Sequence, residues 1–447
     1  MRNHNEGFQA YYKYGASALT LSLVLAGCAI NRPVDKLAEG CRLPAEVIEV
    51  AIAPGGGDQL GIAAAVAAPP DGVIEKVLRG AAQSRLASMG IAPTTINNLV
   101  LSGGGQHGSF GSGFLKGMQT ASSLPRYHIV SGVSTGALQA TFALLGQDAA
   151  PDDRMLDVAN DFPAEANTTP RTNIDDLVSG YTISREKTLY NQKGVSGIIR
   201  GAAKGNLAPL AKRLDLLITP KTLAAVKRAN DDEGRKLLVA LLNYETGKVE
   251  VVDMTALAAR YDGSNFDLIQ HCYNQVLIAA SSEPIGAPPV VIDGKFYFDA
   301  GLRYGVFLRR YSAGVMRIMN SEPGLRRWPR SSLLPALRTD IIVNGDLTIS
   351  AENTKFKTKF SALDVAGRGR KILVDQIYRF SVAEITNSKS DDHVVRLAKI
   401  RVDEVAEGLP AEKATFDPVY MKEMIALGKR RGAAGDWQSR DEVMAIQ

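Results

Sequence analysis

Residues 97–117 read NNLVLSGGGQHGSFGSGFLKG, and this stretch says most about the fold. A short apolar run, typical of a buried strand, leads into three consecutive glycines, Gly103, Gly104 and Gly105, and then into a segment with apolar residues at helical spacing. A tight turn from strand to helix needs one or two glycines. Three in a row indicate that the bare backbone of this loop has a further task.

Strand-like and helix-like segments alternate beyond this loop. The run YHIV (127–130) precedes TGALQATFALLG (135–146), and such alternation is typical of a parallel sheet covered by helices. The fold class is therefore α/β. The pattern also predicts a helix over 73–89, two strands around a turn at 245–247, a helix in 267–282, a strand in 294–301, helices near 369–386 and 417–430, and a strand in 393–402.

Two phosphate-binding interpretations of the glycine loop fail. Gly103, Gly105 and Gly108 match GxGxxG, but a dinucleotide site needs an acidic residue about 20 residues further on. None occurs between Asn97 and Asp148. A GxxxxGK[ST] loop fails as well, because serine follows Gly108 where lysine is required. No cofactor is implied.

A second motif, GVSTG at 132–136, lies between the strand YHIV and the helix after it. It matches G-x-S-x-G, the nucleophile elbow, in which a sharp turn holds the serine in a strained conformation. Gly132 and Gly136 would let strand and helix pass closely on either side of the turn. Ser134 is therefore the candidate nucleophile.

A serine hydroxyl needs a base to act as a nucleophile at neutral pH. After Ser134 the chain offers His271 and His393, and only His393 lies beyond a candidate aspartate, as the order Ser, Asp, His requires. The alternative base is Asp299 itself, which ends the apolar-aromatic run KFYFD and precedes a small residue and a glycine. An aspartate there would reach the sheet edge at which open α/β folds build their sites.

The three motifs occur in the order found in patatin-like phospholipases, and the chain resembles that family. The third motif, Asp299 to Gly301, is similar to the family's D-G-[GA] sequence. The resemblance implies a three-layer α/β/α fold with a mainly parallel central sheet, and a dyad in which Asp299 takes the proton of Ser134 directly. It also implies an oxyanion hole built from the loop amides of Gly103, Gly104, Gly105 and Gly108.

Two positions depart from the family pattern. His107 stands where the family often has arginine or lysine before the last glycine of the loop, and Ala300 stands in the aspartate motif in place of glycine. The first leaves the role of His107 open, and the second exchanges one small residue for another. The segment FDPVYMKEMIALGKRRGAAGDW, from residue 416, is similar to segments near the end of related bacterial proteins.

The resemblance implies a serine hydrolase that cleaves acyl ester bonds of membrane phospholipids. An esterase or acyltransferase acting on smaller acyl esters, and a lipoprotein of this fold without catalysis, remain alternatives. No metal is expected, because the chain has five histidines and no HExxH or EF-hand-like loop. Nucleic acid is not an expected partner either, because no basic-aromatic signature occurs.

The N-terminus resembles a bacterial lipoprotein signal. Arg2 and Lys13 precede the apolar stretch 15–28, which is too short to span a bilayer and ends in Leu-Ala-Gly-Cys. This lipobox predicts cleavage before Cys28 and a lipid on that cysteine, so the mature protein would be anchored to a membrane without spanning it. Ala29, in place of aspartate, favours the outer membrane, on its periplasmic or surface face.

Length and composition bound the domain organisation. The 447 residues are 45% hydrophobic and 22% charged with a net charge of +5, which suits a large globular domain. The sequence predicts a signal peptide over 1–27, an anchored segment and linker over 28–96, a catalytic core over 97–320 and a helical extension over 321–447 packed on the same domain. Besides Cys28 the chain has Cys41 and Cys272, which would pair in an oxidising periplasm only if the fold brings them together.

Overall fold

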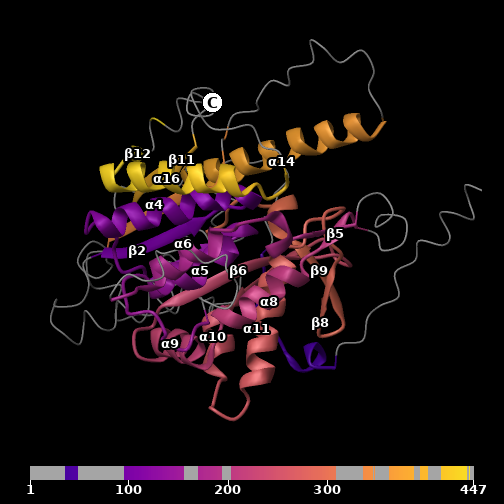
Figure 1. Cartoon of the computed structure of the whole chain (residues 1–447), viewed down its shortest axis with the longest axis horizontal. Helices are drawn as coiled ribbons and strands as arrows, with labels where there is room; N and C mark the ends of the chain where they lie inside the picture. The colour runs from indigo at the N-terminus through magenta and orange to yellow at the C-terminus, as the bar shows by residue number, and fades with distance from the viewer. Residues whose placement is uncertain are drawn as a thin grey trace, which may run out of the picture.

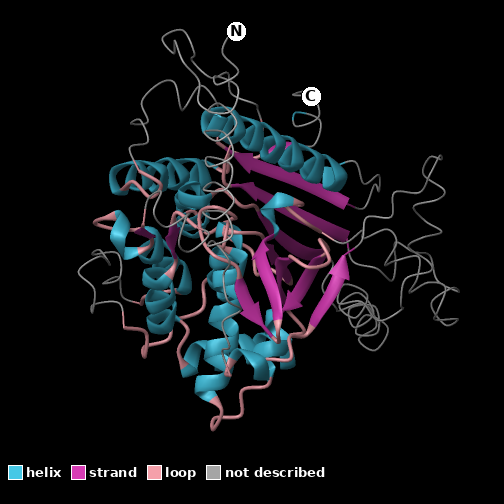
Figure 2. Ribbon diagram, turned by 90° about the vertical axis from the view of Figure 1, so that its right-hand side faces the viewer, coloured by secondary structure: helices cyan, strands magenta, loops and turns pink. Residues whose placement is uncertain are grey.

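The computed structural model describes residues 36–48, 95–155, 170–193, 203–308, 336–345, 347, 362–386, 393–400, 414–439 and 442. The strands of the main sheet are β1 (Ala45–Ile48), β2 (Thr95–Leu101), β3 (Ile129–Gly132), β6 (Lys236–Asn243), β7 (Val249–Asp253), β8 (Val290–Ile292), β9 (Lys295–Asp299), β10 (Ala336–Val343), β11 (His393–Lys399) and β12 (Gln438–Ser439). Within the described residues they follow the order β1-β7-β6-β3-β2-β10-β11-β12, with β9 paired to β6 and β8 to β9. Figure 2 shows these strands side by side, with most helices gathered to one side.

The centre of the sheet is parallel. β6, β3, β2, β10 and β11 run in one direction, whereas β7, β9, β1 and β12 pair antiparallel to their neighbours. In the register of the central strands Leu101 lies beside both Gly132 and Ile342. The loops that follow β2, β3 and β10 therefore leave the sheet next to one another at its carboxyl edge.

Alternate residues of β2 enter two separate cores, one on each face of the sheet. Leu99 and Leu101 join a large cluster, whereas Val100 joins a smaller one with Val382 and Ile385. The large cluster includes side chains of α4 (Gly108–Thr120), α5 (Thr135–Leu145), α6 (Asn173–Tyr181), α8 (Ala208–Leu217), α9 (Pro220–Asp231), α10 (Met254–Ala259), α11 (Phe266–Ala280) and α16 (Pro418–Ala434). The smaller cluster is closed by α14 (Ala362–Thr386). Helices on both faces of a mainly parallel sheet confirm the expected three-layer α/β/α fold.

Several glycines of the opening stretch serve helix packing. In Figure 1 α16 lies along α4, and a Cβ at Gly113 or Gly117 of α4 would overlap a backbone carbonyl oxygen of α16. Conversely, a Cβ at Gly428 of α16 would overlap the carbonyl oxygen of Phe110. The two backbones approach so closely that only glycine fits.

The predicted elements that fall on described residues are found, and the C-terminal part needs a correction. β3, α5, β6, β7, α11, β9, β11 and α16 match the sequence prediction, and α14 begins earlier than predicted, at Ala362. The segment 321–447 is not only helical, because its described part also contributes β10, β11 and β12 to the central sheet. The sequence analysis misses β10 altogether. The helix over 73–89, the signal peptide and Cys28 lie outside the described residues.

A disulfide attaches the N-terminal described segment to the domain. Cys41 and Cys272 are bonded, with a Cα–Cα distance of 5.4 Å across a sequence separation of 231. Both are buried, and β1, just after Cys41, pairs with β7. The pairing that the sequence leaves open is thus present. Among the helices that the structure describes, none combines the length and apolar character needed to cross a membrane.

Candidate active site

Ser134 occupies a strained turn between β3 and α5. Its backbone has φ 54° and ψ −126°, a left-handed conformation that costs a non-glycine residue about 1–3 kcal/mol. A Cβ at Gly132 would lie 2.5 Å from the carbonyl oxygen of Gly136, and a Cβ at Gly136 would overlap the carbonyl oxygen of Leu101. Both glycines are therefore required by close backbone approach, and the turn has the geometry of a nucleophile elbow.

Asp299 lies at the same end of β6 as the elbow. In the register Val239 pairs with Gly132 and, two residues on, Leu241 pairs with Asp299. The Asp299 side chain is buried, and its Oδ1 accepts a 2.7 Å hydrogen bond from the N–H of Gly301. Burial raises the pKa of the Asp299 carboxyl to about 6, against the opposing effect of hydrogen bonds from Ser134 and Gly301.

The glycine loop has fewer open amides than the sequence predicts. The N–H of Gly103 donates to the carbonyl oxygen of Gly305 at 3.2 Å. The N–H of Gly108 donates to the carbonyl oxygens of Gln106 and Gly105, and a Cβ on Gly108 would overlap Thr135 Oγ1. These two amides do not fit the predicted role in an oxyanion hole, because one serves loop attachment and the other helix capping and packing.

The remaining two loop amides are positioned by their neighbours. Gly104 and Gly105 stand where the short helix η2 (Gly105–His107) begins, and the first N–H groups of a helix have no partner within it. The carbonyl oxygen of Gly104 accepts a bond from the N–H of His107 at 3.1 Å and lies 3.0 Å from His107 Nδ1. Because a trans peptide points its C=O and N–H in opposite directions, these bonds turn the Gly105 N–H away from His107.

His107 therefore acts on the conformation of the loop. Its ring contacts Tyr420 of α16 edge-on, with centroids 5.6 Å apart, which holds the imidazole against the Gly104 carbonyl. The sequence leaves the role of this residue open, and the structure places its ring in contact with the Gly104 carbonyl oxygen.

Neither candidate histidine of a triad is near Ser134. The strand register places His393 beside Leu337, and Leu337 beside Ile96 at the start of β2. The elbow instead follows Gly132, which lies beside Leu101 at the end of β2. At about 3.3 Å per residue this separation is roughly 16 Å along the strands. The His393 Nε2 atom instead contacts Thr339 Oγ1 at 2.8 Å.

His271, the other candidate, lies within α11. Ser281, which follows that helix, lines the pocket beside Ser134. At 1.5 Å per residue His271 is roughly 15 Å further back along the helix. A Ser-His-Asp triad is thus excluded for both histidines.

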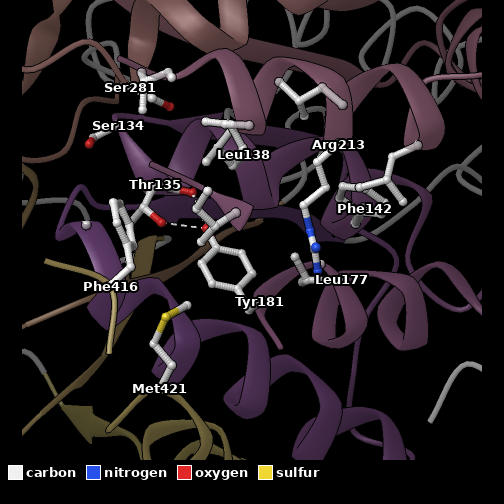
Figure 3. Close-up of a pocket in the computed structure, with 17 residues that line it drawn as sticks. Ser134, Thr135, Leu138, Phe142, Leu177, Tyr181, Arg213, Ser281, Phe416 and Met421 are labelled. Atoms are coloured by element: carbon white, nitrogen blue, oxygen red, sulfur yellow. Dashed lines mark hydrogen bonds between the residues drawn. The ribbon is translucent and has the colours of Figure 1, made fainter. Parts of the chain in front are cut away.

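An apolar pocket opens beside Ser134 (Figure 3). The empty space within it is about 760 Å³, a figure that includes open solvent at its mouth. Ser134 lies at one end and Arg213 toward the other, where the guanidinium donates to the carbonyl oxygens of Ser179 and Thr182. Most other lining side chains are apolar: Leu138, Phe142, Leu177, Leu189, Leu207, Leu210, Leu214, Leu217, Phe416 and Met421.

The residues that shape the pocket, and one polar group near Ser134 and Asp299, are not predicted from the sequence. The pocket leucines have the helical spacing of core residues, so no local signal marks them. Tyr181 fixes the base of the elbow by donating to the carbonyl oxygen of Thr135 at 2.9 Å. Tyr378, on α14, lies beside the glycine loop and has no motif around it. Among the described residues, no three His, Cys, Asp or Glu side chains are arranged to hold a metal ion.

The family model described as "Patatin-like phospholipase" matches residues 99–309. No curated protein matches the chain. Among solved structures, the crystal structure of VipD from Legionella pneumophila is similar over 78% of this chain and 68% of its own, with 12% sequence identity and a TM-score of 0.29. The glycine loop, the elbow and Asp299 all fall inside the matched range, and residues 99–309 of this chain form a domain of the patatin-like phospholipase family.

Proposed function

We propose that this protein is a serine hydrolase that cleaves acyl ester bonds of membrane phospholipids through Ser134 and Asp299. The observation that carries the proposal is the contact between these two side chains at the end of an apolar pocket. The strained elbow exposes the hydroxyl to the pocket, while the carboxyl is buried behind it. This arrangement suits a nucleophile whose proton passes directly to the neighbouring carboxylate.

The chemistry proceeds by acyl transfer to water. Asp299 accepts the proton as Ser134 Oγ bonds the ester carbonyl carbon, and the alcohol then leaves with a proton returned from Asp299. Water hydrolyses the resulting acyl-enzyme by the same proton route. A carboxyl with a pKa of about 6 is a stronger base than an ordinary aspartate, and it is still ionised at neutral pH. The N–H groups of Gly104 and Gly105, with the N-terminus of α5, favour the negative charge that develops on the carbonyl oxygen.

The apolar pocket and the outer face of α14 support a lipid substrate. The leucine-rich pocket suits an acyl chain whose carbonyl carbon lies at Ser134. On α14, the side chains of Val365, Leu373 and Phe380 are exposed to 62%, 66% and 67%. Exposed large apolar side chains on a helix next to a site suit contact with the surface of a bilayer.

A membrane-anchored location in an oxidising compartment fits the same proposal. The lipobox at 25–28 would supply a lipid on Cys28, and the anchored protein would meet its substrate in the membrane. The disulfide between Cys41 and Cys272 supports an environment outside the cytoplasm. We place the protein at the outer membrane, on its periplasmic or surface face.

The decisive experiment is labelling with a fluorophosphonate probe, followed by product analysis. The wild type should label at Ser134 and release fatty acid from mixed phospholipid vesicles, as seen by mass spectrometry. Ser134→Ala and Asp299→Asn should each remove hydrolysis by about 10⁴-fold or more, while His393→Ala should keep it. Failure to label Ser134 would favour a protein of this fold without catalysis. Turnover of soluble esters alone would indicate an esterase in place of the proposed lipid hydrolase. Transfer of the acyl group to an alcohol would indicate an acyltransferase.

A further inference from the structure

The inner face of α14 reaches the dyad although the helix lies outside residues 99–309. α14 packs on the short helix η5 (Ala300–Leu302), which follows Asp299. Ser381 of α14 accepts a 3.1 Å hydrogen bond from the N–H of Gly305, and the carbonyl oxygen of Gly305 accepts the N–H of Gly103. The C-terminal helix is thus connected to the glycine loop through Gly305.

Tyr378, one turn before Ser381, brings its hydroxyl to the centre of this arrangement. A Cβ at Gly103 would overlap the Tyr378 hydroxyl and would lie 3.0 Å from Ser134 Cβ. A Cβ at Gly301 would lie 3.4 Å from the same hydroxyl oxygen and 3.1 Å from Asp299 Oδ1. The phenol oxygen therefore lies between the glycine loop, the nucleophile and the base.

From this position the Tyr378 hydroxyl can replace the Gly103 N–H as a hydrogen-bond donor. The N–H of Gly103 is bonded to Gly305 and is not directed at the substrate. The hydroxyl of Tyr378 lies next to Gly103, on the side of the loop that faces Ser134. A phenol hydroxyl is a good hydrogen-bond donor, and side chains of tyrosine serve in oxyanion holes of enzymes.

We propose that the Tyr378 hydroxyl donates a hydrogen bond to the oxyanion that forms when Ser134 attacks the ester, so that α14 supplies a catalytic residue. The inference rests on the proposed function. As the bond between Ser134 Oγ and the carbonyl carbon forms, the π electron pair of the carbonyl moves onto its oxygen. The proton of Ser134 passes to Asp299, and Tyr378 keeps its own.

The environment keeps this phenol protonated. Burial raises the pKa of Tyr378 far above its ordinary value, and the negative charge of Asp299 raises it further. The hydroxyl is therefore a donor over the whole range in which Asp299 is an active base. The aromatic ring is held in place as well, because a Cβ on Gly305 would overlap it.

The test is Tyr378→Phe, which keeps the ring and removes only the hydroxyl. On a p-nitrophenyl acyl ester we expect kcat to fall by about 10²-fold, the loss typical of one oxyanion donor, with KM nearly unchanged. The acid limb of the pH profile should not move, because the phenol acts on the ester oxygen and not on Asp299. Tyr273→Phe is the matched control, since its buried hydroxyl bonds Thr141 Oγ1 at 2.8 Å, about two turns along α5 from Ser134.

Three results would overturn the role of Tyr378. They are a kcat within about twofold of wild type, an equal loss in Tyr273→Phe, or a loss accompanied by a shifted acid limb, which would mean that Tyr378 positions Asp299 instead. The wild type, assayed in parallel, separates this inference from the proposed function. An inert wild type that does not label with fluorophosphonate refutes both, whereas an active wild type with a fully active Tyr378→Phe variant refutes only the donor role.

Discussion

The backbone N–H of Gly103 donates a hydrogen bond to the carbonyl oxygen of Gly305 at 3.2 Å. This bond joins the loop after β2 to the segment after Asp299, far apart in the sequence. The loop beside Ser134 is thereby fixed relative to Asp299. Preorganisation of this kind lets an active site stabilise charge without rearranging during the reaction.

The pH dependence of hydrolysis should follow Asp299. Burial raises the pKa of its carboxyl to about 6, and the base is inactive when protonated. We therefore expect kcat/KM to rise with pH and to level off above an apparent pKa near 6. The measurement is a pH–rate profile on a p-nitrophenyl ester between pH 4 and 9.

A free histidine would titrate in almost the same range, so histidine variants are the necessary control. His393→Ala and His271→Ala should leave the acid limb where it is, because neither side chain lies near Ser134. Movement of the limb in either variant would assign the base to that histidine. A limb near the pKa of an ordinary aspartate would contradict the burial of Asp299.

The same carboxyl should destabilise the folded protein at neutral pH. A raised pKa means that the folded state holds its proton more tightly than the unfolded chain, so stability falls as pH rises from 3.8 to about 6. Asp299→Asn removes this ionisation and keeps an oxygen for the Gly301 N–H. The free energy of unfolding of the variant minus that of the wild type should therefore be roughly 2.5 kcal/mol larger at pH 8 than at pH 4.

Urea denaturation of both proteins at the two pH values measures this difference. Asp293→Asn is a suitable comparison, because Asp293 lies in a turn and accepts bonds from the N–H groups of Arg42 and Leu43. It should show no comparable gain. If the Asp299→Asn protein is less stable than the wild type at pH 8, the surroundings stabilise the carboxylate, and its ionisation does not lower the free energy of unfolding.

How much of the site could be predicted depends on how local each feature is. Ser134 and Asp299 are set by short motifs, because a strained elbow needs glycines at fixed offsets and a strand-end aspartate needs small neighbours. The use of the Gly103 amide and the approach of Tyr378 depend on contacts with distant segments, which no local pattern records. The strand β10 was missed for a similar reason, since its place between β2 and β11 is a property of the sheet.

His107 should influence the rate through the Gly104–Gly105 peptide and not as an acid or base. His107→Gln keeps a side-chain donor within reach of the Gly104 carbonyl and should retain activity with an unchanged pH profile. His107→Leu removes the donor, and loss of a bond worth about 1 kcal/mol to the orientation of an oxyanion amide should lower kcat by about fivefold. Steady-state kinetics of both variants decide the point. Equal losses, or a changed pH profile for the glutamine variant, would contradict it.

The disulfide should contribute to stability but not to chemistry. Cys41 and Cys272 close a loop with a sequence separation of 231, and neither lines the pocket. Replacing both by alanine should lower the free energy of unfolding by about 2–5 kcal/mol. Activity at low temperature should be retained. Thermal melts of wild type refolded after reduction in denaturant give the same comparison, and detection of Cys41 and Cys272 as free thiols in denatured, unreduced protein would show that the bond is absent.

The exposed apolar face of α14 should matter on vesicles and not on soluble esters. Leu373 and Phe380 are the most exposed of its large apolar side chains, and burying such a side chain in the bilayer surface contributes about 1.5–3 kcal/mol. In a Cys28→Ala background, which lacks the site of the proposed lipid anchor, Leu373→Glu and Phe380→Glu should each lower hydrolysis of anionic phospholipid vesicles by about tenfold or more. Hydrolysis of a short p-nitrophenyl ester should stay unchanged, because neither side chain lines the pocket. Val394→Glu, at an exposed position on β11 at the opposite end of the parallel strands, should affect neither substrate. A loss of activity on both substrates would mean that the α14 substitutions disturb folding or catalysis. Unchanged activity on vesicles would mean that α14 does not contact the membrane.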